Sequence, residues 1–134
     1  MKIGCDVVDL PRLARILARD GQLFMDRILT GREAGWCCKG DLPVVEKVAA
    51  CLAVKESLIK ALGGRPAGFH WTDLELLPAR PGTPGELVAL WRELAREMGI
   101  NAEKGFFHPC RAYGTKAWAA WGVVEEMVVA VALL

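Results

Sequence analysis

The sequence has little of the residue types on which several common classes of functional site depend. It contains two histidines and five cysteines, and no two cysteines have the C-x-x-C spacing of a zinc or redox motif. An odd number of cysteines without paired loops is typical of a protein kept in the reducing cytoplasm. The formal net charge is only +1, so no field of one sign covers the protein and nucleic acid is not an expected partner.

The sequence also lacks a long uninterrupted apolar run. Its most apolar stretch, residues 117–134, is broken by Glu125 and Glu126 and is too short and too charged to span a bilayer. Near the amino terminus, Asp6 and Asp9 stand where a signal peptide needs an apolar segment. The chain is therefore expected to be cytoplasmic and to have no membrane partner.

Apolar residues are nevertheless abundant. Hydrophobic residues make up 53% of the 134 positions, although a chain of this length has room for only one ordinary domain, expected to span residues 1–134. A single small domain cannot bury that much apolar surface well. We therefore expect part of this surface to lie in an interface between subunits.

Hydrophobic periodicity and turn residues predict a mixture of strands and helices. Expected strands cover residues 2–9, 71–77, 106–113, 116–122 and 127–134, and expected helices cover residues 11–29, 30–39, 41–62 and 83–98. Gly21 marks a break in the first helix, and residues 122–126 are the expected turn between the last two strands. The order of elements indicates an α+β fold with a largely antiparallel sheet packed on the long helix over residues 41–62.

Helix starts are predicted from capping residues. Thr30 and Glu33 form a capping box, in which each side chain satisfies a backbone amide of the other residue. Asp41 is expected to cap the long helix, with Pro43 in its first turn. Thr83 is expected to begin the last helix in the same way.

One carboxylate falls on the apolar side of the long helix. At about 100° per residue, Glu56 lies near the middle of an apolar stripe with 3.6-residue spacing. The stripe consists of Val45, Val48, Ala49, Leu52 and Ile59. A carboxylate in such a position is costly unless it is paired or binds a cation. Lys60 is one turn further on, so a Glu56–Lys60 ion pair that only stabilises the helix is one interpretation, and a cation site is the other.

A second carboxylate, Asp6, interrupts the first strand. The apolar residues of this strand face both ways, so we expect both of its faces to be covered. Asp9 is the better candidate for a turn residue at the strand end. Two misplaced acids in one small domain indicate a shared cation, and oxygen ligands favour magnesium or calcium over zinc. Because magnesium completes its shell with water and substrate phosphates, phosphate chemistry is the predicted activity.

A glycine-rich segment directly after the long helix is a candidate phosphate contact. Gly63 and Gly64 would allow backbone amides to approach a phosphate, and Arg65 would add positive charge. The alternative is that the two glycines only end the helix.

Arginines are concentrated early in the chain. Arg12, Arg15 and Arg19 lie close together with no acid between them. They form either a solvated helix face or a basic surface that attracts an acidic partner. The formal net charge of only +1 does not decide between these two interpretations.

A zinc site is a weaker hypothesis. His108 and Cys110 can be combined with Cys37 and Cys38, but their spacing matches no compact zinc pattern. A Cys–His nucleophile pair has no local support either. Both hypotheses rank below the carboxylate site.

Four segments of the chain occur in an order that points to one family. They are Gly4-Cys5-Asp6-Val7-Val8-Asp9-Leu10 with Arg12, Arg27-Ile28-Leu29-Thr30 with Glu33, Ala53-Val54-Lys55-Glu56-Ser57 with Lys60-Ala61-Leu62-Gly63, and Phe69-His70-Trp71-Thr72-Asp73-Leu74-Glu75-Leu76. Together they resemble the holo-acyl-carrier-protein synthase family of phosphopantetheinyl transferases. The resemblance covers about residues 3–77 in register and continues loosely to the C-terminus. It implies a phosphopantetheinyl-transferase-like fold and a trimer with coenzyme sites between subunits.

The resemblance also implies an activity, which is magnesium-dependent transfer of 4'-phosphopantetheine from coenzyme A to a serine of an acyl carrier protein. The magnesium ligands of the family fall on Asp6 and Glu56, the lysine beside the coenzyme falls on Lys60, and the carrier-binding arginine falls on Arg12. The expected site therefore consists of Glu56 and Lys60 as catalytic residues, Asp6 and Glu56 as metal ligands, Lys60, Gly63, Gly64 and Arg65 as coenzyme contacts, and Arg12 and Arg15 as carrier contacts.

Two regions depart from the pattern of the family. Residue 51 is cysteine where the family usually has an arginine that supports substrate binding. Residues 116–126 contain neither the serines nor the histidine of the Ser-x-Ser-His type motif of the family, and His108 would have to act from a displaced position. Two functions therefore follow from the resemblance: an active transferase, or an impaired relative that binds coenzyme A or the carrier protein without transfer.

Overall fold

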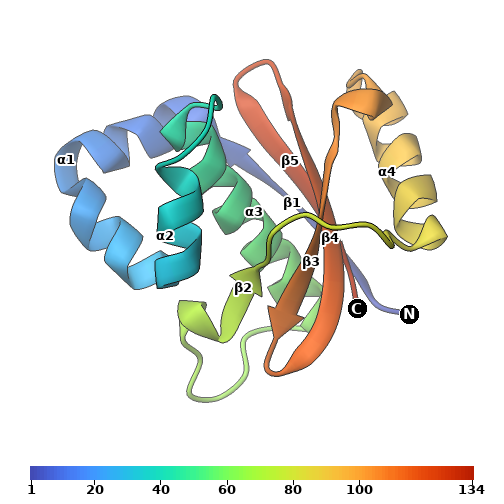
Figure 1. Cartoon of the computed structure of the whole chain (residues 1–134), viewed down its shortest axis with the longest axis horizontal. Coiled ribbons are helices and arrows are strands. Elements are labelled where there is room, and N and C mark those ends of the chain that lie inside the picture. Colours follow the sequence, from blue (N-terminus) through green and yellow to red (C-terminus); the bar gives the residue numbers. More distant parts are fainter.

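The computed structural model describes all residues from Met1 to Leu134 and has an α+β architecture (Figure 1). The strands are β1 (Ile3–Asp9), β2 (Leu74–Leu76), β3 (Phe106–Ala112), β4 (Thr115–Val124) and β5 (Met127–Leu133). The helices are α1 (Leu10–Ile28), α2 (Gly31–Cys37), α3 (Val44–Leu62) and α4 (Gly85–Met98), with short 3-10 helices at Trp71–Asp73 and Ala102–Lys104. None of these helices is both long enough and apolar enough to cross a membrane.

The strands form one sheet in the order β1-β5-β4-β3-β2, and every neighbouring pair is antiparallel. Reciprocal backbone hydrogen bonds of Lys2 and Leu134 (3.1 and 2.8 Å) bring the two termini side by side (Figure 1). The β4–β5 turn consists of Glu125 and Glu126 and is tighter than the turn predicted over residues 122–126. The predicted α+β class and antiparallel sheet are confirmed.

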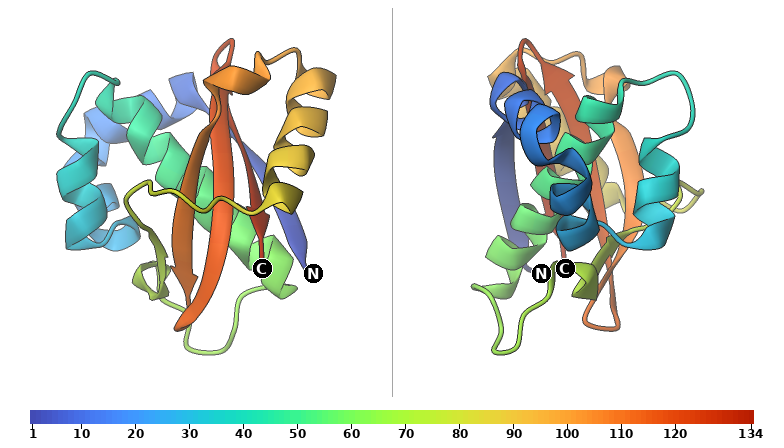
Figure 2. Two further views of the ribbon diagram at one scale, coloured as in Figure 1. Left: turned by 45° about the vertical axis from the view of Figure 1, so that its right-hand side comes forward. Right: turned by 90° about the vertical axis from the view of Figure 1, so that its left-hand side faces the viewer.

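Helices cover both faces of the sheet (Figure 2). α1, α2 and α3 lie on one face, where the larger core cluster fills the space between α3 and the strands. α4 lies on the opposite face and packs on the sheet through a smaller cluster. That cluster consists of Leu87, Trp91, Ala95, Ala120 and Val131.

α3 is enclosed by the sheet on one side and by α1 and α2 on the other. Side chains on all sides of the helix are buried between Lys47 and Ala61. Val45 and Leu52, which the predicted stripe places in the core, are only partly buried. The stripe therefore describes only part of the buried surface, because a helix with neighbours on several sides has no single apolar face.

β1 crosses α3 at very close range. A Cβ atom added at Gly4 would lie 2.0 Å from Ser57 O and 2.7 Å from Ala61 N. Only glycine, which has no Cβ, allows the strand backbone to approach the helix this closely. Because alternate residues of a strand share a face, the approach also brings Asp6 next to α3.

Replacement of Gly4 by alanine is expected to lower the free energy of unfolding by about 1–3 kcal/mol, because the helix backbone must move to accept the methyl group. Urea unfolding followed by circular dichroism measures this loss. Gly35→Ala is the matched control, since a Cβ there meets nothing within 4 Å and alanine favours the helical state. Equal stability of Gly4→Ala and the wild type would contradict the close approach.

α1 begins directly at the end of β1. The Asp9 carboxylate accepts a hydrogen bond from Arg12 N (3.1 Å), so the residue expected at the strand end is the N-cap of α1. The helix is kinked at Asp20 (φ −134°, ψ 34°), one residue before the break predicted at Gly21. Gly21 lowers the stability of the helix at this point, and the residue that leaves the helical conformation is its neighbour Asp20.

The caps predicted for the two later helices are wrong. α3 begins at Val44 and α4 begins at Gly85, each directly after a proline and without a side-chain cap hydrogen bond. Asp41 and Thr83 therefore do not cap them. Proline has a fixed φ and no amide to satisfy, so it leads into a helix without help from a capping side chain.

The strand predicted over residues 71–77 is shorter than expected. Trp71–Asp73 form a 3-10 helix, and only Leu74–Leu76 form β2. All three strand residues are buried, whereas the sequence pattern indicated alternation. The carboxylate of Glu75 is tolerated in this position because Thr30 Oγ1 and Arg111 donate hydrogen bonds to it.

Candidate active site

β1 and α3 bring Asp6 and Glu56 to the same pocket, which has a volume of about 370 Å³. The rest of its wall comes from the end of β1, from α1 and from α3. These residues are Val7, Val8, Asp9, Arg12, Leu13, Ile16, Phe24 and Leu52. The two acids that interrupt apolar patterns in the sequence are therefore neighbours in space, although they are far apart in the chain.

Each of these carboxylates faces a cation, but the pairing differs from the one predicted within the helix. Lys60 Nζ lies 2.8 Å from Asp6 Oδ1 and 3.1 Å from Cys5 O, while Arg65 lies 3.7 Å from Glu56. The predicted Glu56–Lys60 ion pair is not formed, because the lysine turns toward β1. The hydrogen bond with Asp6 raises the pKa of Lys60, so its ammonium group stays charged.

The oxygen donors of this pocket fit a magnesium ion. The side chains of Asp6 and Glu56 are 22% and 29% exposed, so both carboxylates can be reached from solvent. Magnesium usually takes one or two protein carboxylates and completes its shell with water and phosphate oxygens. Asp6 and Glu56 are the side chains of this pocket that could hold such an ion.

The glycines after α3 end the helix. The Gly63 N–H donates to Lys60 O (3.1 Å) and the Gly64 N–H donates to Ile59 O (3.0 Å). Gly63 has the left-handed conformation (φ 87°) that glycine adopts readily at a helix end. Both of these amides are thus engaged in capping, so neither glycine N–H is free to bind a phosphate.

Arg65 is the cation of the same segment, and it is paired only loosely with Glu56, at 3.7 Å. Its guanidinium carbon lies 5.3 Å from the centroid of the Phe69 ring and 5.0 Å from that of Trp71. Stacking of this kind orients a planar cation on an aromatic surface. The side chain is still 54% exposed, so it can meet an anion beside Glu56.

The predicted carrier-binding arginines lie on α1, one turn apart. Arg12 lines the pocket and its side chain is exposed, as is that of Arg15. The structure therefore places the first of them at the same opening as Asp6 and Glu56. The second extends the basic surface away from the pocket.

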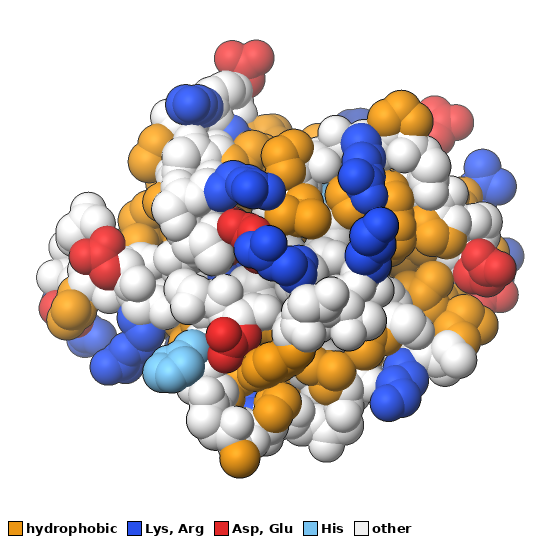
Figure 3. All heavy atoms as spheres, turned by 60° about the horizontal axis from the view of Figure 1, so that its bottom comes forward, with side chains coloured by type: hydrophobic (Ala, Val, Ile, Leu, Met, Phe, Trp, Pro, Cys, Tyr) orange, Lys and Arg blue, Asp and Glu red, His pale blue; other side chains and the backbone are white.

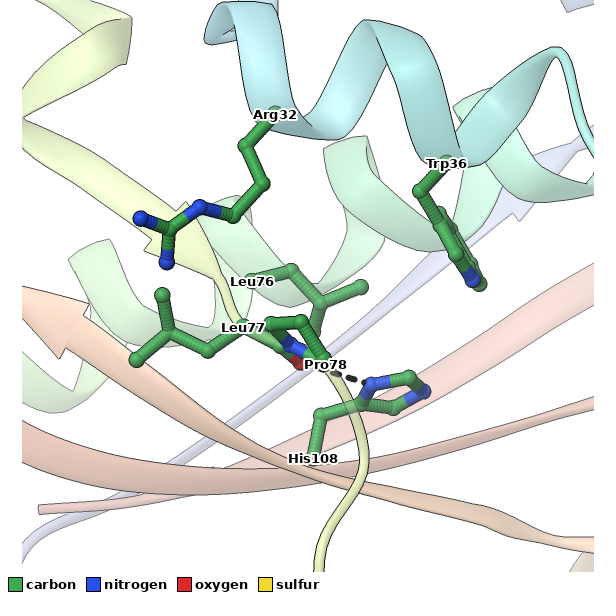
Figure 4. Close-up of a pocket in the computed structure, with 6 residues that line it drawn as sticks. All are labelled: Arg32, Trp36, Leu76, Leu77, Pro78 and His108. Carbon is green, nitrogen blue, oxygen red and sulfur yellow. Dashed lines mark hydrogen bonds between the residues drawn. The ribbon is translucent and has the colours of Figure 1, made fainter.

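His108 lies elsewhere, in a small pocket of about 30 Å³ under α2 (Figure 4). The pocket is lined by Arg32, Trp36, Leu76, Leu77, Pro78 and His108. His108 is only 4% exposed, and its Nδ1 donates a hydrogen bond to Leu77 O (2.9 Å). It does not line the pocket of Asp6 and Glu56, so it cannot take over a missing histidine there.

The zinc hypothesis is wrong. No group of three or more His, Cys, Asp and Glu side chains is placed to hold a metal ion. Cys38 is exposed, whereas Cys37, Cys110 and His108 are buried. The four residues therefore do not surround one point.

Lowering the pH below about 6.5 is expected to destabilise the protein through His108. Burial lowers the pKa of His108 in the folded state, whereas a histidine in the unfolded chain titrates near pH 6.5. Below that pH the unfolded state binds more protons, so the free energy of unfolding falls with decreasing pH, by at most about 1.4 kcal/mol per pH unit.

Urea unfolding between pH 7.5 and 5.0 (about the range in which histidine titrates) measures this loss. His108→Gln should make the profile flatter, and His70→Gln, at an exposed position, should leave it unchanged. An unchanged profile in His108→Gln would show that another group causes the pH dependence.

A buried ion pair between Glu33 and Lys55 lies next to the site in the sequence of α3, since Lys55 directly precedes Glu56. Glu33 is 1% exposed and Lys55 is 0% exposed. The Lys55 ammonium donates hydrogen bonds to Glu33 Oε1 (2.7 Å), Ile28 O (2.6 Å) and Trp71 O (3.2 Å). Glu33 Oε2 in turn accepts from Leu76 N (2.9 Å). The pair thereby joins α1, α2, α3 and β2 around the residue that precedes Glu56.

The capping box over Thr30 and Glu33 is confirmed, but the sequence pattern did not reveal the partner of its glutamate. Glu33 Oε1 accepts from Thr30 N (2.9 Å) as predicted and also from Lys55. A lysine inside a helix is usually assigned to the solvent side. The available signal was its position, since Lys55 stands among the most apolar residues of α3.

Comparison with known sequences identifies the class of protein. Residues 2–104 match the 4'-phosphopantetheinyl transferase superfamily, and this range includes the whole pocket. The chain therefore belongs to this superfamily, and the class of enzyme is phosphopantetheinyl transferase. The family indicated by the four sequence segments is confirmed.

Similar sequences narrow the comparison from the superfamily to one kind of enzyme, the holo-acyl-carrier-protein synthases. The holo-acyl-carrier-protein synthase of Leifsonia xyli is 48% identical over 124 residues, which cover 92% of this chain and 95% of the relative. The synthase of Moorella thermoacetica is 31% identical and the match covers 94% of both chains. A shorter match to the synthase of Chlorobium luteolum, at 40% identity, covers 59% of this chain and 66% of the relative.

Solved structures show the same fold. The holo-acyl-carrier-protein synthase of Neisseria meningitidis superposes with a TM-score of 0.66 at 26% identity, covering 98% of this chain and 95% of the other. The synthase of Helicobacter pylori in complex with coenzyme A has a TM-score of 0.64 at 19% identity, covering 98% and 97%. Both likenesses extend through the C-terminal hairpin, where the sequence segments match only loosely.

Proposed function

We propose that this protein transfers the 4'-phosphopantetheine group of coenzyme A to a serine of an acyl carrier protein, with magnesium. The observation that carries the proposal is the pocket that both Asp6 and Glu56 line, with Lys60 held beside Asp6. The matched relatives are holo-acyl-carrier-protein synthases, and one structure of the same fold is a coenzyme A complex. The substrates follow from these relatives, and the pocket supplies residues suited to them.

Charge neutralisation is the first task of the site. A magnesium ion held by Asp6 and Glu56 would neutralise the pyrophosphate of coenzyme A as the leaving phosphate gains charge. Lys60, with its raised pKa, stays cationic and binds the leaving adenosine bisphosphate. Arg65 adds a second cation beside Glu56. Phosphoryl transfer depends mainly on this kind of positioning and charge stabilisation.

Removal of a proton is the second task. The carrier serine must lose its hydroxyl proton as its oxygen attacks the pantetheine-side phosphorus of the pyrophosphate. We assign this proton to Glu56, directly or through a bound water, because it is a carboxylate that lines the pocket and can be reached from solvent. The bond to adenosine bisphosphate breaks, and the phosphopantetheine group remains on the serine.

We assign binding of the carrier protein to α1. Arg12 lines the pocket and Arg15 is exposed one turn away, so an acidic partner would be drawn to the pocket opening. Lys and Arg side chains also gather toward the middle of the face shown in Figure 3, with apolar side chains beside them. A basic surface of this kind attracts acidic partners.

We also propose that the protein assembles as a trimer. On the face of β1 that points away from α3, Ile3 is 46% exposed and Val7 is 45% exposed. Neighbouring exposed aliphatic side chains on a strand are a mark of an interface between chains. An interface between chains would cover these side chains, and sedimentation that shows only monomer at micromolar concentration would contradict it.

Incubation with an apo acyl carrier protein, coenzyme A and magnesium tests the transfer directly. The intact mass of the carrier is expected to rise by one phosphopantetheine group, and the gain should disappear when the metal is chelated. A carrier in which the acceptor serine is replaced by alanine is the control and should keep its mass. Absence of a gain on any carrier, with a folded protein, would contradict transferase activity.

A second candidate function is binding without transfer. The observation that favours it is β4 (Thr115–Val124), which carries no serine and no histidine, so it lacks the motif found there in the family. Cys51, where the family has an arginine, is completely buried and cannot contact a substrate. Coenzyme A binding by calorimetry together with an unchanged carrier mass would support this function over the first.

A further inference from the structure

The two carboxylates of the candidate metal site are each paired with a cation of the same chain. Lys60 Nζ lies 2.8 Å from Asp6 Oδ1, and Arg65 Nη2 lies 3.7 Å from Glu56 Oε1. The Lys60 and Arg65 side chains are 55% and 54% exposed, so both pairs are weak and can open at little cost. Two negative and two positive charges therefore balance each other at this pocket.

Lys60 has a second contact that does not depend on its carboxylate partner. Its ammonium group also donates a hydrogen bond to Cys5 O (3.1 Å) in β1. When the ion pair with Asp6 opens, this hydrogen bond can remain, so the positive charge stays at the edge of the pocket. An ammonium group has three N–H donors, which leaves donors for a phosphate oxygen.

Arg65 has a second contact of a different kind. Its guanidinium carbon lies 5.0 Å from the centroid of the Trp71 ring and 5.3 Å from that of Phe69, and these two rings pack edge to face. Trp71 is itself held, because its carbonyl oxygen accepts a hydrogen bond from the buried Lys55 ammonium (3.2 Å). The aromatic surface can therefore keep the guanidinium in place when it separates from Glu56.

This pairing makes the site unfavourable for a divalent cation alone or for a diphosphate alone. A cation held by the two carboxylates has to displace Lys60 and Arg65, and it leaves an excess of positive charge. A diphosphate bound by Lys60 and Arg65 has to separate them from the same carboxylates, and it leaves an excess of negative charge. When both ligands bind, the two ion pairs are opened only once and the charges balance again, which is positive cooperativity.

We propose that Lys60 and Arg65 are exchangeable counter-ions of the two carboxylates, which makes binding of a divalent ion and binding of the coenzyme mutually dependent. In the loaded site the ammonium and guanidinium groups contact phosphate oxygens instead of Asp6 and Glu56. The inference rests on the proposed function, which supplies the pyrophosphate of coenzyme A as the anion. It adds that the protein binds a divalent ion only weakly without the coenzyme.

Binding of Mn²⁺ with and without saturating coenzyme A tests the proposal, and no carrier protein or transfer is needed. Electron paramagnetic resonance measures free Mn²⁺, and titrations of coenzyme A alone correct for the ion that it binds in solution. The coupling factor is the affinity of the protein for Mn²⁺ with the coenzyme, divided by the affinity without it. For the wild type we expect a coupling factor of at least about 10.

Loss of one counter-ion should raise the first affinity and lower the coupling. Lys60→Met and Arg65→Met should each bind Mn²⁺ without the coenzyme about two- to fivefold more tightly, because one exposed ion pair no longer competes. The coupling factor should fall by about the same ratio, and the effects should multiply in Lys60→Met/Arg65→Met. Both positions are exposed, so the variants should fold like the wild type, which circular dichroism checks.

Arg12→Met is the matched control. Arg12 lines the same pocket but forms no ion pair. Its loss removes one positive charge without removing a competing counter-ion, so the coupling factor should keep its wild-type value. If Lys60→Met and Arg65→Met change the coupling factor no more than Arg12→Met does, the inference is wrong.

Two outcomes with the wild type separate this inference from the proposed function. Equal affinity for Mn²⁺ with and without the coenzyme would overturn the inference alone, because the carboxylates would still hold the ion and the mass of the carrier protein would still report transfer. If no Mn²⁺ binds to the protein under either condition, the metal site is wrong, and the inference and the magnesium-dependent function fail together.

Discussion

Replacement of either Asp6 or Glu56 by alanine should lower the rate of phosphopantetheine transfer by at least about 100-fold. Both carboxylates line the pocket, and under the proposed function loss of one would leave the divalent ion with a single protein ligand. The positive charge proposed to neutralise the pyrophosphate in the transition state would then be poorly held. The rate is measured from the intact mass of the carrier protein as a function of time.

Isosteric variants and a control on the same helix separate this effect from misfolding. Asp6→Asn and Glu56→Gln keep the size of the side chains and should lose activity to a similar extent. Glu46→Ala removes an acid of α3 that does not line the pocket and should keep wild-type activity. Full activity in Asp6→Asn or Glu56→Gln would show that the two carboxylates are not the metal ligands.

Lys55→Met is expected to lower the free energy of unfolding by about 3–5 kcal/mol. Glu33 is buried, and the substitution leaves its carboxylate without the cation that compensates for desolvation. It also removes the hydrogen bonds that Lys55 donates to the backbone carbonyls Ile28 O and Trp71 O. For a domain of this size the loss is a large share of the total stability. Urea unfolding followed by tryptophan fluorescence measures it.

The double variant Glu33→Gln/Lys55→Met should recover part of that loss, because no buried charge is then left unpaired. Arg19→Ala is the control, since the ion pair of Arg19 with Asp20 is exposed, with the Arg19 side chain 76% accessible, and its removal should change stability little. If the double variant is no more stable than Lys55→Met, the ion pair is not the source of the effect.

Local sequence patterns predicted much of the fold because they have local causes. The capping box at Thr30 and Glu33 depends on contacts within one helical turn. The last three strands, β3, β4 and β5, were predicted from strand-like residue patterns and from the short turns between them. The predicted caps at Asp41 and Thr83 failed where proline offered another way to begin a helix.

The candidate site was predicted from residues that interrupt apolar patterns. Asp6 and Glu56 were identified in this way, and the structure places them at one pocket. The partner of Lys60 was not predicted correctly, because the helix alone offers Glu56 at the right spacing whereas the crossing of β1 over α3 is a property of the folded chain. The buried pairing of Lys55 with Glu33 was not predicted either, because it depends on the packing of α2 against α3 in the folded chain.

Manganese, which replaces magnesium at oxygen sites, gives the most direct measurement of the central claim that Asp6 and Glu56 hold a divalent ion against the phosphates of coenzyme A. Electron paramagnetic resonance of the wild-type protein titrated with Mn²⁺ and coenzyme A is expected to show one bound ion per chain, with tighter binding when the coenzyme is present. Asp6→Asn and Glu56→Gln should lose this bound ion. Equal binding of Mn²⁺ and coenzyme A by the wild type and by both variants would contradict the account.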